Sequence, residues 1–204
     1  MKAELHCHSL YSHDCKMKIK DIFKMADKRN LDFISITDHS SVKSQKKAKN
    51  ISKDYNVTYI PGVEIERIGH ILAYGIEKIP YGSFEEVLEY IKDNNGFFIA
   101  AHPYGELFRP SFEKKDLKKF DALETLNGMS FNRNNKKAEK IATKLNKTKV
   151  SGSDAHFLED VGRFACELKG NGFFDSLRKG KVKVPNKKTH FFELLSKRLV
   201  KRFY

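Results

Sequence analysis

The chain has 204 residues, of which 40% are hydrophobic and 32% are charged, a composition typical of one soluble globular domain. No apolar run approaches the roughly 20 residues of a bilayer-spanning helix, and the first residues show no apolar signal segment, so we expect a cytoplasmic protein. The formal net charge of +13 favours anionic substrates or partners, but charge alone does not indicate a polynucleotide.

Cysteine usage agrees with that location. The three cysteines, Cys7, Cys15 and Cys166, are an odd number and form no CxxC pair. We therefore predict reduced thiols, with neither a disulfide framework nor a cysteine zinc site.

Apolar runs alternate with helical patterns along the chain, which is typical of an α/β protein. Several runs are almost continuously apolar, as parallel strands covered on both faces should be. We predict seven strands, at Ala3–His8, Asp32–Thr37, Thr58–Ile65, His70–Tyr74, Gly96–Ala101, Ala122–Leu126 and Lys149–Ser153. Seven strands in one domain suggest a barrel rather than an open sheet.

Three segments between these strands repeat apolar residues with the helical period of 3.6. They are Ile19–Ala26, Phe84–Ile91 and Ala138–Leu145. Ser83, followed three residues later by Glu86, predicts a capping box at the start of the second helix.

Metal-binding residue types gather at the ends of the predicted strands or in the loops beside them. They are His6, His8, His39, Glu64, His70, His102, Asp154 and His156. Loops at the carboxyl ends of barrel strands converge on one mouth, so we expect these side chains to meet. Residues at i and i+2, such as His6 and His8, share one face of a strand and suit one ion. Imidazole combined with carboxylate favours zinc, manganese or iron over calcium or magnesium.

Six segments resemble the PHP (polymerase and histidinol phosphatase) domain family, in the family's order. They are LHCHSLYSHD at 5–14, ITDH at 36–39, PGVEI at 61–65, GH at 69–70, AHP at 101–103 and GSDAH at 152–156. The resemblance implies a distorted seven-stranded (β/α) barrel, similar to a TIM barrel, which we assign to residues 1–186. It also implies two or three divalent metal ions (Zn²⁺, Mn²⁺ or Fe²⁺) at the carboxyl ends of the strands.

The resemblance further implies three sets of metal ligands. The first set is His6, His8, Glu64 and Asp154. The second set shares Glu64 as a bridge and adds His70 and His102. The third set is His39, His156 and Asp14. His13 is the alternative to Asp14, because family members place either residue type in this loop.

The residue cluster together with this resemblance implies a metal-dependent phosphoric ester hydrolase. We expect it to hydrolyse a phosphomonoester or phosphodiester (a nucleotide, a cyclic nucleotide phosphate or a short oligonucleotide) by metal-activated hydroxide. Asp154 and Glu64 are the expected catalytic residues. Arg133 and Arg163 follow strand ends and are candidates for gripping the substrate phosphate. The sequence has no Ser/His/Asp triad, which does not favour covalent catalysis. It also has no P-loop pattern, which does not favour a motor that hydrolyses nucleoside triphosphates.

Two alternatives share the same site. A histidinol-phosphate-type phosphatase would differ only in its substrate pocket. A catalytically silent metal-binding PHP module, like those attached to some DNA polymerases, would bind metal without turnover.

Residues 187–204 form a basic amphipathic segment beyond the motifs, for which we predict a helix. Phe192, Leu195, Leu199 and Phe203 fall on one helical stripe, and the segment carries several lysines and arginines. Such a helix can dock on the barrel, contact an anionic membrane surface or extend a nucleic-acid surface. His190 belongs to this segment and not to the metal cluster.

Overall fold

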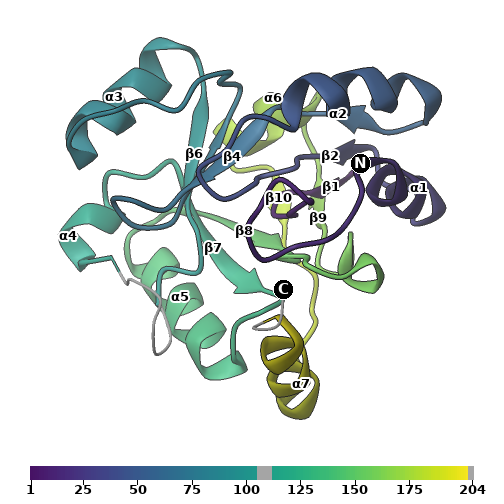
Figure 1. Ribbon diagram of the computed structural model, residues 1–204. Coiled ribbons are helices and arrows are strands. Elements are labelled where there is room, and N and C mark those ends of the chain that lie inside the picture. The colour runs from purple at the N-terminus through teal and green to yellow at the C-terminus, as the bar shows by residue number, and fades with distance from the viewer. Residues whose placement is uncertain (105–111, 202–204) are drawn as a thin grey trace.

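The computed structural model describes residues 1–104 and 112–201, and these residues form a mixed α/β fold with two five-stranded sheets (Figure 1). The first sheet contains, in order across it, β10 (Val182–Lys183), β9 (Cys166–Leu168), β1 (Lys2–Glu4), β2 (Phe33–Ile34) and β3 (Thr58–Tyr59). The second contains β4 (Gly62–Ile65), β5 (Ile71–Tyr74), β6 (Phe97–Ala100), β7 (Ala122–Asn127) and β8 (Thr148–Gly152).

Helices flank both sheets in the described part of the chain. They are α1 (Ile19–Lys28), α2 (Gln45–Ile51), α3 (Phe84–Asp93), α4 (Lys114–Leu117), α5 (Asn132–Lys144), α6 (Phe173–Arg178) and α7 (Phe191–Lys201), with 3₁₀ turns η1 (Ser52–Asp54) and η2 (Leu158–Asp160). Helices α1 and α2 share a buried apolar cluster with β2, whereas α3 and α5 pack on β4 to β7 through a second cluster. Figure 1 shows α1 and α2 on one side of the strands and α3, α4 and α5 on the other.

The three helices predicted from apolar periodicity are confirmed. The four periodic residues of the first, Ile19, Ile22, Phe23 and Ala26, are all buried. The capping box of α3 is also confirmed, because Ser83 Oγ accepts from the Glu86 backbone N–H and Glu86 Oε2 accepts from the Ser83 backbone N–H at 2.6 Å. Two orphan donors at the start of the helix are thereby satisfied.

The prediction of one strand over 58–65 is wrong. That stretch forms β3 in the first sheet and β4 in the second, with Ile60 and Pro61 between them. Proline has no backbone N–H to donate to a ladder, so the strand breaks there.

Two further strand predictions need correction. Pairs β4–β5 and β5–β6 are antiparallel, although their continuous apolar character suggested a parallel sheet. Strands β9 and β10 were not predicted, because they are short and not continuously apolar: β9 alternates between buried and exposed residues, and neither residue of β10 is buried.

The two sheets meet at two isolated backbone bridges beside the predicted metal ligands. Cys7 pairs with Ala155 and His39 pairs with Glu64, both in parallel orientation. His8 N donates to Ala155 O at 2.9 Å, and Ser40 N donates to Glu64 O at 2.7 Å. Strand pairing in the described residues thus gives two sheets joined near the site, and does not by itself show a closed barrel.

The predicted C-terminal helix is present as α7 over the part of it that is described, whereas Phe203 lies outside the described residues. The apolar stripe does not pack inward: Phe192 is 84% exposed and Leu199 is 58% exposed. Instead α7 is held by buried Leu194 and by polar contacts. Neither α7 nor any other helix in residues 1–104 and 112–201 has the length and hydropathy needed to cross a bilayer.

Candidate metal centre

The nine predicted metal ligands converge from the segments that follow β1, β2, β6 and β8, from β4 itself and from the residue before β5. Their ligand atoms form four overlapping groups, each with all atoms within 4.8 Å of one another. The groups are His6–His8–Glu64, His6–His102–Asp154, Glu64–His70–His102 and His8–His39–His156. Asp14 joins the last group through both His39 and His156.

The first predicted set surrounds one point. Glu64 Oε2 lies 3.3 Å from His6 Nε2 and 3.4 Å from His8 Nε2. Asp154 Oδ1 lies 3.6 and 3.3 Å from the same two nitrogens. Two ligand atoms that are each about 2.1 Å from a tetrahedral ion are about 3.4 Å apart. The separations therefore match four ligands of a single ion.

The second set uses the other oxygen of Glu64. His70 Nδ1 lies 2.7 Å and His102 Nε2 lies 3.2 Å from Glu64 Oε1. With Oε2 facing His6 and His8, this carboxylate is oriented as a bridge between two groups of imidazoles.

Asp14 lies beside the other two residues of the third set, whereas His13 lies farther out. Asp14 Oδ2 lies 3.2 Å from His39 Nε2 and 3.4 Å from His156 Nε2. His13 is exposed, and its ring lies 5.2 Å from the His39 ring, centroid to centroid.

Glu124 is a buried residue of the site that the sequence analysis missed. Its Oε1 lies 3.0 Å from His6 Nδ1, and its Oε2 accepts from the His102 backbone N–H at 2.7 Å. Asn127 Nδ2 donates to Glu124 Oε2 and, at 3.2 Å, to Asp154 Oδ2. A carboxylate behind a histidine fixes the tautomer and presents the other nitrogen to an ion. A glutamate in the middle of an apolar strand was the available signal, because charged side chains are rarely buried without a partner.

His8 is supported in a similar way through a hydroxyl. Its Nδ1 lies 3.2 Å from Ser12 Oγ, which donates to Asp38 Oδ1 at 2.9 Å. Asp38 also accepts from the backbone N–H and hydroxyl of Ser9. Asp38 precedes His39 in the ITDH segment, but the sequence analysis gave it no role.

Glu4 fastens the first strand to the last loop. This fully buried carboxylate accepts from the backbone N–H groups of His6, Ser153 and Gly162 at 2.8–2.9 Å. Burial raises the pKa of Glu4, although these hydrogen bonds act in the opposite direction. The contacts hold the strand that carries His6 against the loop that carries Asp154.

The charges of the cluster differ from residue to residue. Burial, with the neighbouring His39 and His156, holds the pKa of His8 well below its usual range, so its imidazole is neutral and has a lone pair to offer. Burial opposes ionisation of Glu64, but His6 and His39 outweigh it and hold its pKa well below the usual range. Burial opposes protonation of His6 and His39, but Asp154 outweighs it at His6 and Glu64 at His39, so the pKa of His6 is held well above its usual range and that of His39 is raised to about 10. An ion binding to these two imidazoles would displace their protons, because divalent ions take neutral imidazole and ionised carboxylate as ligands.

Two site residues have backbone conformations that non-glycine residues rarely adopt. His102 has φ of +28° and Asp154 has φ of +50°. Such conformations persist where the surroundings over-determine them, and they are common at functional sites. Here Glu124 holds the His102 backbone and Asn127 holds the Asp154 side chain.

The site chemistry fits a divalent metal. Nε2 of His6 and Nε2 of His8 are buried and form no hydrogen bond within the described part of the chain, although carboxylate oxygens lie 3.3–3.6 Å away. Buried polar nitrogens are almost always satisfied in native proteins, so these two require a partner. An ion between the nitrogens and the carboxylates would satisfy both.

The two predicted phosphate-gripping arginines lie in different surroundings. Arg133 is exposed, with its guanidinium 5.8 Å from the centre of the Phe131 ring. Arg163 donates to both carboxylate oxygens of Glu193 in α7, and its side chain lines a cavity with Lys2 and Arg29.

Comparisons with known proteins agree with this geometry. A family model described as the PHP domain matches residues 4–149, and a second, described as PHP-associated, matches residues 132–182. An uncharacterised protein of Methanocaldococcus jannaschii is 36% identical over an alignment of 120 positions, and the match covers 52% of this chain and 70% of that protein.

Solved structures of low sequence identity share the fold. A two-domain protein from Bacteroides vulgatus, described as containing a predicted PHP-like metal-dependent phosphoesterase, is 18% identical with a TM-score of 0.78. That match covers 98% of this chain and 69% of the Bacteroides chain. PsfC from Pseudomonas syringae is 16% identical with a TM-score of 0.66, and the match covers 99% of this chain and 98% of PsfC.

Proposed function

This chain belongs to the PHP domain family, and on that premise we propose that it hydrolyses phosphate esters with divalent metal ions held by the clustered histidines and carboxylates. One observation carries the proposal: nine such side chains converge, with separations that suit shared ions. The net charge of +13 favours an anionic substrate, and among phosphate esters we propose a nucleotide, a cyclic nucleotide phosphate or a short oligonucleotide.

The proposed ligands are the three sets predicted from the sequence, for two or three ions of zinc, manganese or iron. His6, His8, Glu64 and Asp154 would hold the first ion. His70 and His102 would hold a second with Glu64, and Asp14, His39 and His156 would hold a third. Bound metal would supply a water of lowered pKa near neutral pH and positive charge for the phosphate oxygens.

The protein's own groups set the geometry of the reaction. Asp154 presents Oδ1 to His6 and His8, while Asn127 donates to its Oδ2, so the carboxylate is fixed in place to orient a water molecule. Glu64 is the proposed bridge and second catalytic residue. Because His6, His8 and Glu64 are fully buried, bulk water is kept from this end of the site, and charges inside it interact strongly.

Substrate phosphate would be gripped by arginine. Arg133 is the more available candidate, because Arg163 is already paired with Glu193. Phosphate binding by Arg163 at the metal centre would require that pair to open and the side chain to leave the other cavity that it lines.

We also propose that the two sheets are parts of one distorted seven-stranded barrel in residues 1–186. The Cys7–Ala155 and His39–Glu64 bridges support this proposal, since each joins one sheet to the other. The family matches end at residue 182, which supports treating 187–204 as a separate C-terminal segment.

The test is a hydrolysis screen over phosphomonoesters, phosphodiesters and short RNA and DNA, with Mn²⁺, Zn²⁺ or Mg²⁺ added. We expect metal-dependent release of phosphate or mononucleotide, lost on chelation and in His8→Ala. His190→Ala is the matched control, because this exposed histidine lies outside the cluster. Full activity after chelation would refute the proposal. Faster turnover of histidinol phosphate than of a dinucleotide would favour the histidinol-phosphatase alternative, and retained metal without any turnover would favour a silent module.

A further inference from the structure

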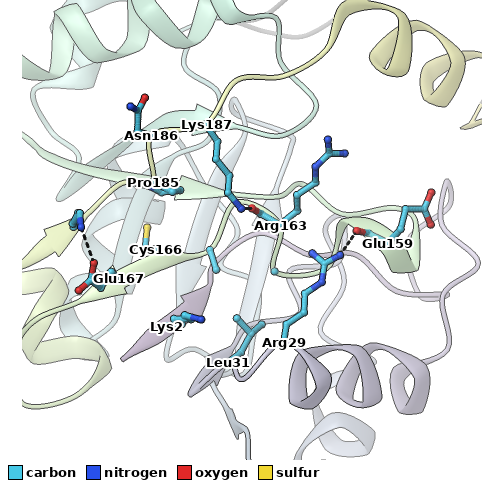
Figure 2. Close-up of a pocket in the computed structure, with 13 residues that line it drawn as sticks. Lys2, Arg29, Leu31, Glu159, Arg163, Cys166, Glu167, Pro185, Asn186 and Lys187 are labelled. Carbon is cyan, nitrogen blue, oxygen red and sulfur yellow. Dashed lines mark hydrogen bonds and ion pairs between the residues drawn. The ribbon is translucent and has the colours of Figure 1, made fainter.

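A second concave site lies at the opposite end of β1 from the metal centre. Figure 2 shows this cavity, which has a volume of about 780 Å³ and is lined by Lys2, Arg29, Leu31, Arg163, Pro185 and Lys187 among others. Lys2 begins β1, whereas His6 and His8 follow its end. The two sites share no lining residue, although Gly162 of the cavity donates to Glu4, whose other oxygen accepts from the His6 backbone N–H.

Positive charge dominates the lining. Five cationic side chains, Lys2, Arg29, Arg163, Lys183 and Lys187, face two carboxylates, those of Glu159 and Glu167. Lys183 is neutralised by Glu167 at 3.2 Å, and Arg163 is neutralised by Glu193.

The other three cations form no ion pair with a carboxylate in the described residues. Arg29 donates to the Glu159 carbonyl oxygen and Lys187 donates to the Arg163 carbonyl oxygen, both at 2.6 Å. These acceptors are neutral and leave the positive charge in place. Lys2, Arg29 and Lys187 therefore bring three positive charges to one cavity, against one remaining lining carboxylate, that of Glu159.

Mutual repulsion among these groups is evident at Lys187. Burial, followed by the positive charges of Arg29, Arg163 and Lys2, lowers the pKa of its ammonium group. A bound anion would relieve this repulsion. A carboxylate carries one negative charge, whereas a phosphate group carries close to two at neutral pH and suits both a guanidinium fork and ammonium groups.

Apolar groups complete the wall. Leu31, Ala165 and Pro185 line the same cavity as the cations. The volume lies in the range of about 300–1,000 Å³ that is usual for small-molecule sites. We propose that this cavity binds a small organic molecule that bears a phosphate group, with Lys2, Arg29 and Lys187 on the phosphate and the apolar wall against the rest of the molecule. The site is distinct from the metal centre, and its occupation does not depend on the proposed hydrolysis.

The test separates the two sites by chelation and by mutation. The chelated full chain, with its fold checked by circular dichroism, is titrated calorimetrically with a nucleoside 5′-monophosphate, so that neither metal-held phosphate nor turnover contributes. We expect one molecule to bind. Lys2→Gln with Lys187→Gln should weaken binding at least tenfold. Lys46→Gln with Lys53→Gln removes the same charge from exposed lysines outside the cavity and should weaken it less than twofold.

A second measurement uses the metal-loaded chain and inorganic phosphate, which cannot be hydrolysed. We expect two phosphate sites in the original chain and one in the Lys2→Gln, Lys187→Gln variant. If both double substitutions weakened monophosphate binding equally, general attraction to positive charge would explain the binding, and the proposal would be overturned. Identical stoichiometry in the original chain and the cavity variant would overturn it as well. A third result would also overturn it: a single-stranded oligonucleotide binds and is weakened by the cavity substitutions, while the monophosphate does not bind.

Discussion

Glu124 Oε1 lies 3.0 Å from Nδ1 of His6, and the opposite ring nitrogen of that histidine faces Glu64 and Asp154. The second oxygen of Glu124 accepts from the His102 backbone and from Asn127. One buried carboxylate from β7 therefore sets the positions of two imidazoles and, through Asn127, of Asp154. It acts through ligands of the proposed ions rather than on the ions themselves, so it is a positioning residue.

Glu124→Gln is expected to weaken metal binding about 10–100-fold, the usual effect of losing a carboxylate behind a metal-binding histidine. The amide has one accepting and one donating end, whereas Glu124 accepts on both sides. Either His6 or the His102 backbone and Asn127 would then face a donor. The measurement is the metal dissociation constant by chelator competition. Glu89→Gln, at an exposed glutamate of α3, is the control. Unchanged metal affinity in a folded Glu124→Gln protein would show that Glu124 has no such role.

Asp14→Asn is expected to remove one equivalent of metal, because Asp14 Oδ2 is shared between His39 and His156. An amide is a much poorer ligand for a divalent ion than a carboxylate. His13→Ala should leave the stoichiometry unchanged, since His13 is exposed. Elemental analysis of the purified variants distinguishes the two residues. Loss of metal in His13→Ala with full occupancy in Asp14→Asn would reverse the assignment.

Sequence reasoning identified the residues that gather at the site but not what supports them. Histidines and carboxylates at strand ends are visible as residue types, so their convergence was predictable. Glu124 and Glu4 sit inside apolar runs, where nothing in the sequence tells which buried donors they accept from. Those donors are backbone N–H groups of His102, Ser153 and Gly162, whose positions exist only after folding.

The limits of the fold prediction have the same origin. Helices such as α3 carry a period and a cap in their own residues, so they were predicted correctly. Whether β4, β5 and β6 run parallel or antiparallel depends on which strands pair, and a continuous apolar run does not encode that. The apolar stripe of α7 was predictable from the sequence pattern. Its outward orientation was not, because it depends on buried Leu194 and on contacts with Asp160 and Arg163, which are distant in sequence.

Gly152→Ala is expected to destabilise the fold by about 1–3 kcal/mol, the usual cost of overpacking. A Cβ at Gly152 would lie 2.5 Å from His6 Cβ and 2.6 Å from Glu124 Oε1. Urea unfolding measures the loss, and chelator competition should show weaker metal binding, because His6 must shift. Gly172→Ala is the control: its added Cβ meets nothing within 4 Å, although its φ of +121° strains the backbone. Metal binding lowered equally in both variants would exclude specific crowding of His6.

Docking of α7 is expected to weaken in acid. Hydrogen bonds from Arg163 and Lys197 lower the pKa of Glu193 from 4.5 to about 2. A carboxyl with a depressed pKa stabilises the docked form fully above its ordinary value, and this contribution is lost as the pH falls from about 4.5 through about 2. A dye attached at Ser196→Cys reports the mobility of α7 by anisotropy, since the native cysteines are buried and react poorly.

Glu193→Gln provides the matched comparison, because it removes the charge at every pH. With the dye in place, we expect lower anisotropy in this variant at pH 7, where the unsubstituted helix is still docked. The difference between the two proteins should shrink as the pH falls toward 2, because protonation then removes the same charge from Glu193. A difference that persists undiminished at pH 2, or is absent at pH 7, would show that the contacts of Glu193 with Arg163 and Lys197 do not hold α7 in place.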